Sequence, residues 1–421
     1  MKANLVYSDL NPCGGGERLT LATMQALAEM DIDIELTTLQ KPDIIRLENA
    51  FGKRLASVIE NIKKINILDA WEEQSIIDNI SGKDYDLVIN THGDIAPYYH
   101  KSISKDNAIT YCHFPSAKSF IESEDKAYFE KHIVARGADA FTPARPRYAD
   151  SSSVIAATAY EDPLTDKAHL GKNINSKRQR YIKWLKEAYK NLMKNSTLLT
   201  NSEYSRKAIF NIYGIDDAIV ISPPVDVETF RNEVLSSKSH GKVEGEEEII
   251  LVTCRIDPLK KIDNALRLAE LLKASNIGNG MRIVGSLEAY YYDYYLHLKK
   301  MAKDLNLTDY ITLEVNVSLD KLLSLMRKSS IYFHPKPAEH FGMSIVEAMS
   351  AGLVPIVSDV GGQTEFVPSQ YQFHTLEDAA KIVSSAFDAP FSERAAISDS
   401  VTRFSASNYI KCFKQLLVSH V

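Results

Sequence analysis

The feature that most limits the fold of this chain is a repeated alternation of short apolar runs with segments of helical periodicity. This alternation predicts parallel sheets covered by helices, because parallel strands need a crossover connection, which is usually a helix. A polar stretch, Arg231–Glu248, separates two such sets and predicts a linker or an exposed excursion of the chain. The candidate strands of the first set are Asn4–Tyr7, Ile34–Leu39, Leu87–Asn90, Ala108–Cys112 and Leu198–Asn201. Those of the second set are Ile249–Cys254, Met281–Val284, Tyr310–Leu313, Ile331–His334 and Val354–Val357.

We therefore predict an α/β chain of two Rossmann-like, doubly wound domains, residues 1–230 and 249–404, which face an interdomain cleft. Ligands of such sheets bind beyond the carboxyl ends of the strands. Residues that carry chemistry are therefore expected in the loops that follow strands.

Composition narrows the class of protein. The formal net charge of −6 and the pI near 6.0 argue against a nucleic-acid-binding role. The four cysteines are widely scattered and show no CxxC spacing, which is typical of reduced thiols in a cytoplasmic protein. The sequence begins directly with a candidate strand, so we expect no signal peptide. No apolar run reaches the roughly 20 residues that span a bilayer.

Two carboxylates bracket a glycine near the C-terminal end, in the motif Glu339-x7-Glu347. The first carboxylate precedes a short predicted helix and the second lies on it, so both can address one ligand. Between them, the backbone N–H groups of Gly342, Met343 and Ser344 form an anion site at the helix N-terminus. A site that binds an anion in the middle and hydroxyl groups on either side is suited to a nucleotide-sugar.

Two further segments fit the same ligand. The loop Gly14–Gly16 follows the first strand, and its Gly15 and Gly16 allow the backbone to approach a phosphate or sugar closely. A plain tight turn is the alternative. Arg255 and Lys260 follow the first strand of the second domain, where two cations can neutralise the charge of a departing diphosphate.

One histidine stands out by position. His113, in the segment Tyr111–Pro115, ends a strand of the first domain on the expected cleft. His92 is a weaker candidate by the same reasoning. A structural role is the alternative for both.

A basic segment in the first half of the chain suggests a membrane contact. Residues 172–194 hold eight Lys or Arg side chains and one acid, Glu187. The helix predicted over Lys177–Lys194 is amphipathic, so it either packs one face in the first domain or binds anionic head groups at a membrane surface.

Together these motifs resemble the family 4 retaining glycosyltransferases of the GT-B fold over nearly the whole chain. The matching segments are Gly14–Gly16, Thr200–Ser205, Pro223–Asp226 with Phe230, Arg255 with Lys260, and Glu339 with Glu347. Within the family, Gly14–Arg18, Tyr111–Pro115 and the C-terminal motif are most similar to α-1,2-mannosyltransferases that extend the dolichol-diphosphate-linked oligosaccharide. The chain departs from the family pattern at Leu259 and Lys261, where many members carry Glu and Gly.

The resemblance implies roles for the donor-binding residues. Arg255 and Lys260 would hold the donor diphosphate, and Glu347 would bind the ribose hydroxyls. Glu339, with the amides of Gly342, Met343 and Ser344, would hold the sugar. Gly15 and Gly16 would approach the diphosphate, and His113 would lie beside the transferred sugar.

The resemblance also implies a mechanism and an architecture. The family needs no divalent metal, because its cations stabilise the leaving group, and it uses no cofactor besides a GDP- or UDP-linked sugar. A C-terminal helix, within residues 405–421, would cross back to the first domain.

The leading functional hypothesis is a metal-independent, retaining hexosyltransferase. It would move a hexose, mannose by resemblance, from a nucleotide-sugar to a polyprenyl- or dolichol-linked glycan on the cytoplasmic face of a membrane. One alternative keeps the donor chemistry and uses a soluble sugar or metabolite acceptor. The other is a non-catalytic nucleotide-sugar-binding subunit.

Overall fold

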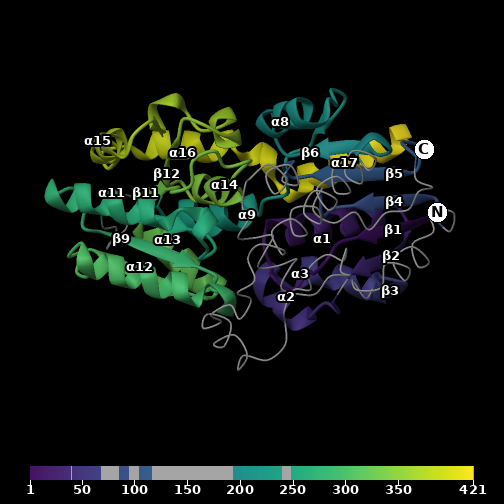
Figure 1. The fold of residues 1–421 in the computed structure, drawn as a ribbon, viewed down its shortest axis with the longest axis horizontal. Coiled ribbons are helices and arrows are strands. Elements are labelled where there is room, and N and C mark those ends of the chain that lie inside the picture. Colours follow the sequence, from purple (N-terminus) through teal and green to yellow (C-terminus); the bar gives the residue numbers. More distant parts are fainter. Residues whose placement is uncertain (39, 68–84, 94–103, 116–192, 239–247, 421) are drawn as a thin grey trace, which may run out of the picture. The chain divides into compact units, whose positions relative to one another are not determined.

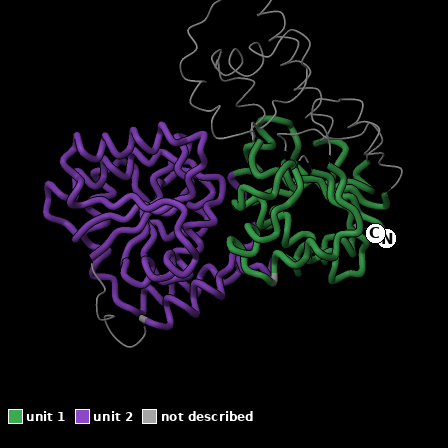
Figure 2. Tube along the Cα trace, turned by 90° about the horizontal axis from the view of Figure 1, so that it is seen from below, with its two compact units in different colours: residues 1–201, 205–221, 410–421 green, residues 202–204, 222–409 purple. Residues whose placement is uncertain are grey.

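The computed structural model describes residues 1–38, 40–67, 85–93, 104–115, 193–238 and 248–420 (Figure 1). Two compact units divide the chain (Figure 2). The first comprises Met1–Asn201, Ser205–Ile221 and Ile410–Val421, and the second comprises Ser202–Tyr204 and Ser222–Tyr409. Each unit is built around its own parallel sheet.

The sheet of the first unit has the order β3-β2-β1-β4-β5-β6-β7, with every neighbouring pair parallel. Because β1 lies inside the sheet and the chain extends it first to one side and then to the other, β1 and β4 mark the point where the winding reverses. The strands are β1 (Lys2–Val6), β2 (Asp33–Thr38), β3 (Lys64–Ile67), β4 (Leu87–Asn90), β5 (Ala108–Cys112), β6 (Thr197–Thr200) and β7 (Ile219–Val220). The described helices of the first unit include α1 (Gly15–Ala28), α2 (Ile44–Phe51), α3 (Lys53–Ala56), the 3-10 helix η1 (Ser57–Asn61) and α8 (Glu203–Tyr213).

The sheet of the second unit has the order β10-β9-β8-β11-β12-β13 and is also parallel. Its winding reverses between β8 and β11. The strands are β8 (Ile249–Thr253), β9 (Gly280–Gly285), β10 (Ile311–Val315), β11 (Ile331–Phe333), β12 (Val354–Ser358) and β13 (Gln372–Phe373). The principal helices are α11 (Ile262–Ala274), α12 (Tyr292–Asp304), α13 (Leu319–Lys328), α14 (Met343–Ser350), α15 (Leu376–Ala386) and α16 (Phe391–Ser400).

The core of the second unit explains why its strands read as continuous apolar runs. Every residue of β8, β11 and β12 is buried. Helix α11 packs leucines and alanines of one face onto this sheet. Strands covered on both faces need apolar side chains on both, which is why no polar alternation marks them.

The prediction of a linker or exposed excursion over Arg231–Glu248 is wrong for residues 231–238, which are helical and partly buried. Residues 227–238 form α9 (Val227–Phe230), a π-helical turn η5 (Arg231–Leu235) and α10 (Ser236–Lys238). Val234 is fully buried in the core of the second unit, and the Arg327 guanidinium donates to the carbonyl of Glu233. The polar composition reflects the exposed side of an ordered segment.

The last helix, α17 (Ala406–His420), begins in the second unit and continues in the first. Within the first unit, the ammonium of Lys414 lies 3.1 Å from the carboxylate of Glu29 on the chain segment after α1. The expected return of the chain to the first domain is therefore confirmed.

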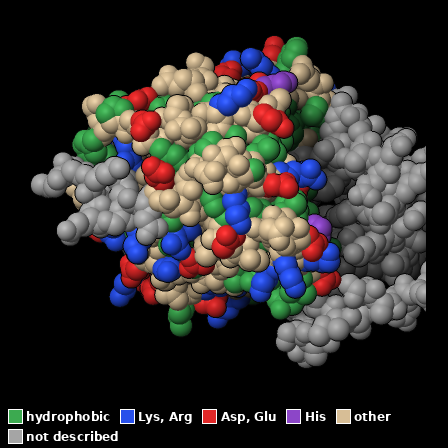
Figure 3. All heavy atoms as spheres, turned by 90° about the vertical axis from the view of Figure 1, so that its left-hand side faces the viewer, with side chains coloured by type: hydrophobic (Ala, Val, Ile, Leu, Met, Phe, Trp, Pro, Cys, Tyr) green, Lys and Arg blue, Asp and Glu red, His purple; other side chains and the backbone are tan. Residues whose placement is uncertain are grey.

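The side chains on the face of the molecule in Figure 3 are mixed in charge, with basic and acidic groups interspersed. Within the described ranges no helix is both long and apolar enough to cross a membrane. The basic helix predicted over Lys177–Lys194 lies outside the described residues apart from its last two.

Candidate active site

The cations of the second unit follow β8 at the point where the winding of the sheet reverses. Asp257, which is buried, accepts the backbone N–H of Lys260 at 3.1 Å through Oδ1. Its Oδ2 lies 3.5 Å from Nη2 of Arg255, whose side chain is half exposed. One carboxylate thus shapes the turn that presents both predicted cations, and no pattern in the sequence predicts its role.

The departure at Lys261 has a structural consequence. Lys261 has a φ of 53°, in the left-handed region, and it caps the N-terminus of α11. Glycine adopts this conformation without strain, which explains why many family members carry it there. Lys261 therefore holds a strained conformation directly after Lys260.

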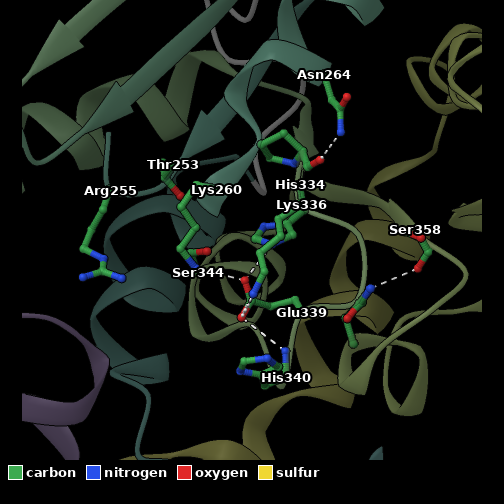
Figure 4. Close-up of polar contacts among 12 residues, drawn as sticks. Thr253, Arg255, Lys260, Asn264, His334, Lys336, Glu339, His340, Ser344 and Ser358 are labelled. Atoms are coloured by element: carbon green, nitrogen blue, oxygen red, sulfur yellow. Dashed lines mark hydrogen bonds and ion pairs between the residues drawn. The ribbon is translucent and has the colours of Figure 1, made fainter. Parts of the chain in front are cut away.

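Glu339 is the centre of the site, as Figure 4 shows. Its Oε2 lies 3.0 Å from Nζ of Lys260 and 3.2 Å from Nε2 of His334. Its Oε1 lies 3.4 Å from Nζ of Lys336 and 3.2 Å from the backbone nitrogen of His340. The structure thus brings Lys260 and Glu339 together, and His334 and Lys336 join them.

The buried side of this cluster is a hydrogen-bonded chain. His334 approaches Glu339 through Nε2 and the hydroxyl of Tyr332 through Nδ1, at 3.2 Å. The Tyr332 hydroxyl also lies 2.9 Å from Oγ of Ser344, in the first turn of α14. One network thus joins the first carboxylate of the motif to the predicted anion site.

Electrostatics fix the protonation states in this network. Burial alone would raise the pKa of Glu339, but Lys260, the hydrogen bond from His334 and Lys336 together hold it well below 4.5. Burial lowers the pKa of His334, despite the neighbouring carboxylate. At neutral pH the site therefore pairs an ionised Glu339 with a neutral His334. The Nε2–H group of His334 donates a hydrogen bond to the carboxylate.

The helix start between the two carboxylates depends on a glycine. Gly342 has a φ of 98° and caps α14, which begins at Met343. The first backbone N–H groups of a helix lack intrahelical acceptors, so those at and after Gly342 can bind an anion. Glu347 lies half-buried on the second turn of α14.

The predicted residues of the first unit gather where β1, β4 and β5 end. The backbone carbonyl of Gly16 accepts the Thr20 hydroxyl, which also lies 2.8 Å from the Thr91 hydroxyl. The carbonyl of Thr91 accepts Nε2–H of His113 at 2.9 Å, and burial lowers the pKa of this histidine. Gly16 and His113 are therefore joined through two threonines.

The glycine loop of the first unit also has a packing reason. A Cβ on Gly16 would lie 2.5 Å from the Tyr7 hydroxyl, which donates to Glu17 at 2.8 Å. The other oxygen of Glu17 accepts the backbone N–H of Gly14. The two hydrogen bonds that Glu17 accepts thus hold the loop before α1 in place. Gly15 is the first residue of that helix.

His92, the weaker candidate, is held next to this loop. Its Nδ1 lies 3.1 Å from the Ser8 hydroxyl, and its ring packs edge-on against Tyr7 at 5.1 Å. Burial lowers the pKa of His92 to about 4. The first unit thus carries two neutral histidines, His92 and His113, at the carboxyl ends of neighbouring strands.

Solved structures identify the fold. The Anabaena protein HepE, crystallised with UDP, aligns over 100% of both chains with a TM-score of 0.64 and 14% identity. Sucrose-phosphate synthase from Thermosynechococcus elongatus aligns over 100% of this chain and 98% of its own, with a TM-score of 0.66 and 12% identity. With the two parallel sheets, these matches define a protein of the GT-B class and confirm that expectation.

The sequence of the second unit matches a known family. Residues 236–386, which contain the cluster around Glu339, match the family described as glycosyl transferases group 1. This match covers about a third of the chain, so the second unit is similar to the group 1 glycosyl transferases over these residues.

Curated relatives cover part of the chain. A GDP-Man:Man(3)GlcNAc(2)-PP-Dol alpha-1,2-mannosyltransferase of Dictyostelium discoideum is 27% identical over 47% of this chain and 41% of its own length. A D-inositol 3-phosphate glycosyltransferase of Mycobacteroides abscessus is 26% identical over 41% of this chain and 39% of its own. The chain thus spans less than half the length of either relative in these matches.

Proposed function

We propose that this protein is a hexosyltransferase that uses a nucleotide-sugar donor and a lipid-linked glycan acceptor. The observation that carries the proposal is the contact between Lys260 and Glu339, with Arg255 in the same loop as Lys260, where the winding of the second sheet reverses. This place lies in the region that matches the group 1 glycosyl transferases. Mannose is the proposed sugar, supported by the Dictyostelium relative.

The proposed chemistry follows from the cations. The bond between C1 of the sugar and the phosphate oxygen breaks while a bond from C1 to the acceptor oxygen forms. Arg255 and Lys260 stabilise the negative charge that develops on the leaving diphosphate. The acceptor oxygen attacks C1 from the face that the diphosphate leaves, and the diphosphate takes the proton of the acceptor hydroxyl. The anomeric configuration is then retained, and neither a metal nor a protein nucleophile takes part.

Two substitutions test the donor site. We expect Arg255→Ala to lower the rate of transfer from GDP-mannose by roughly 100- to 1000-fold, since removing one preorganised stabilising group has effects of that order. Glu347→Ala should instead weaken donor binding by about 10- to 100-fold, through loss of hydrogen bonds to a charged group. Lys273→Met is the control, since this lysine lies at the C-terminal end of α11, away from Lys260, and pairs with Asp309. Wild-type rates in both site variants would contradict the assignment.

A soluble acceptor is the second candidate, favoured by the match to the D-inositol 3-phosphate glycosyltransferase. The two acceptor classes differ in whether product partitions with lipid. Transfer of labelled mannose to a polyprenyl-diphosphate oligosaccharide supports the leading proposal, whereas transfer only to water-soluble sugar phosphates supports the second. If calorimetry shows binding of GDP or UDP but no transfer occurs to either class of acceptor, the result supports a non-catalytic nucleotide-sugar-binding subunit.

The membrane part of the proposal rests on the basic amphipathic segment Lys177–Lys194. We expect the protein to float with liposomes that contain anionic lipid and to be released as salt rises, because screening weakens the attraction. Neutral liposomes are the control. Flotation that ignores both lipid charge and salt would contradict the peripheral location on an anionic cytoplasmic leaflet.

A further inference from the structure

The Glu339 carboxylate is saturated with donors. An ionised carboxylate offers about four lone-pair sites. Each oxygen of Glu339 receives two donors, from Lys260 and His334 on one and from Lys336 and the His340 backbone on the other. A sugar hydroxyl can therefore bind Glu339 only after one of these donors has left.

Two of the four donors are fixed in place. The His334 side chain is 1% exposed, and the Tyr332 hydroxyl holds its second nitrogen. The backbone of His340 is tied through its carbonyl, which accepts the hydroxyl of Ser202 at 2.7 Å. Neither group can leave Glu339 without disturbing the buried structure.

The two lysines are the donors that can move. Their side chains are 22% and 20% exposed for Lys260 and Lys336, and both have long flexible stems. The Lys336 contact is also the longest of the four, at 3.4 Å. Its backbone stays in place, because prolines flank it and the carbonyl of Pro335 accepts Nδ2–H of Asn264 at 3.0 Å.

Charge at the cluster favours an incoming anion. Two ammonium groups share one carboxylate, while the neutral His334 adds no charge, so the group of Lys260, Lys336 and Glu339 carries an excess positive charge. The like charges of the two lysines oppose one another in a partly buried place. A phosphate between them relieves this repulsion.

We propose that Lys336 is a third cation of the donor site, which moves from Glu339 to the phosphate next to the sugar when the donor binds. The move frees one oxygen of Glu339 for a sugar hydroxyl, so binding of phosphate and binding of sugar are coupled. We assign Lys336 to the distal phosphate of the diphosphate, because the sugar that would bind Glu339 is bonded to that phosphate. This inference rests on the proposed function.

The test is titration calorimetry of Lys336→Met with GDP, UDP and the two monophosphates. The nucleoside diphosphate that binds wild type should bind the variant about 10- to 100-fold more weakly, which is the size of a hydrogen bond to a charged group. The matching monophosphate, which lacks the distal phosphate, should change less than about twofold on the same argument. Lys336→Arg should retain most of the affinity, and Lys273→Met should leave both affinities unchanged.

Each other outcome overturns the inference. Unchanged diphosphate affinity means that Lys336 does not reach the phosphate. An equal loss for both nucleotides that Lys336→Arg does not rescue, with a lowered thermal midpoint, means that Lys336 supports the fold only. A loss seen only with the complete nucleotide-sugar means that Lys336 contacts the sugar. Failure of wild type to bind either diphosphate would instead reject the proposed function.

Discussion

Replacement of Glu339 by glutamine is expected to lower transfer at least about 100-fold, as loss of a preorganised charged group typically does. It should also lower the free energy of unfolding of the second unit by about 3 kcal/mol, because it leaves partly buried cations without their counter-charge. The affected groups are Lys260 and Lys336, which converge on this carboxylate (Figure 4). Transfer assays and urea unfolding followed by circular dichroism measure the two effects.

The pH dependence of the same variant has a defined sign. Because the native pKa of Glu339 is held well below 4.5, the unfolded chain takes up the proton first as pH falls. The stabilisation is therefore complete above about pH 4.5, the ordinary value for the carboxyl, and is lost as pH falls through the lowered native pKa. The difference in urea midpoint between wild type and Glu339→Gln should thus shrink below pH 4.5.

Glu314→Gln is the matched control for this experiment. Glu314 also has two cationic partners, Arg282 at 3.6 Å and Lys321 at 3.4 Å, but it lies at a more exposed place. Its loss should cost less than about 1 kcal/mol, as for surface ion pairs. Equal destabilisation by both substitutions would mean that burial adds nothing to the Glu339 cluster.

The central strands of both sheets were predictable, whereas three edge strands were not. Each predicted apolar run overlaps an observed strand, since central parallel strands are buried on both faces. The missed strands β3, β7 and β13 all lie at sheet edges. They are short and partly exposed, so no continuous apolar run marks them.

The site was predictable as far as motif spacing reaches. Spacing identified Lys260 and Glu339, which the structure joins. His334, Lys336 and Asp257 were missed, although their contacts are local: His334 and Lys336 meet Glu339 within the loop after β11, and Asp257 meets Arg255 and Lys260 within the loop after β8. His334 follows a buried strand directly, and the argument applied to His113 would have found it. Lys336 gives no such signal, since a lysine in a loop is ordinarily solvated.

The position of Glu339 depends on close contact between its backbone and the backbone of Gly361 and Gly362. Gly362 donates its N–H to the Glu339 carbonyl at 2.7 Å, and Gly361 pairs with Glu339 as an isolated parallel bridge. A Cβ on Gly362 would lie 2.0 Å from the carbonyl oxygen of His340 and 2.8 Å from its carbon. Those atoms belong to the backbone, so the segment that carries Glu339 must move to admit a methyl group.

Gly362→Ala should therefore lower transfer by about 100-fold although it removes no functional group, because a displacement of about 1 Å has effects of that size. Overpacking should also lower the free energy of unfolding by about 1–3 kcal/mol. Gly214→Ala is the control: its φ of 68° gives backbone strain, but a Cβ there would meet no atom within 4 Å. It should cost about 1 kcal/mol and leave transfer unchanged.

A binding assay on Glu339→Gln and Gly362→Ala distinguishes the role of the Glu339 charge from the role of its position. Glu339→Gln keeps the backbone and removes the charge, so Lys260 and Lys336 become available to phosphate and nucleoside diphosphate affinity should hold or rise. Gly362→Ala keeps the charge and displaces it, so both diphosphate binding and transfer should fall together. If instead Gly362→Ala binds and transfers as wild type does, the Glu339 segment tolerates displacement, and the geometry of this carboxylate is not what the reaction requires.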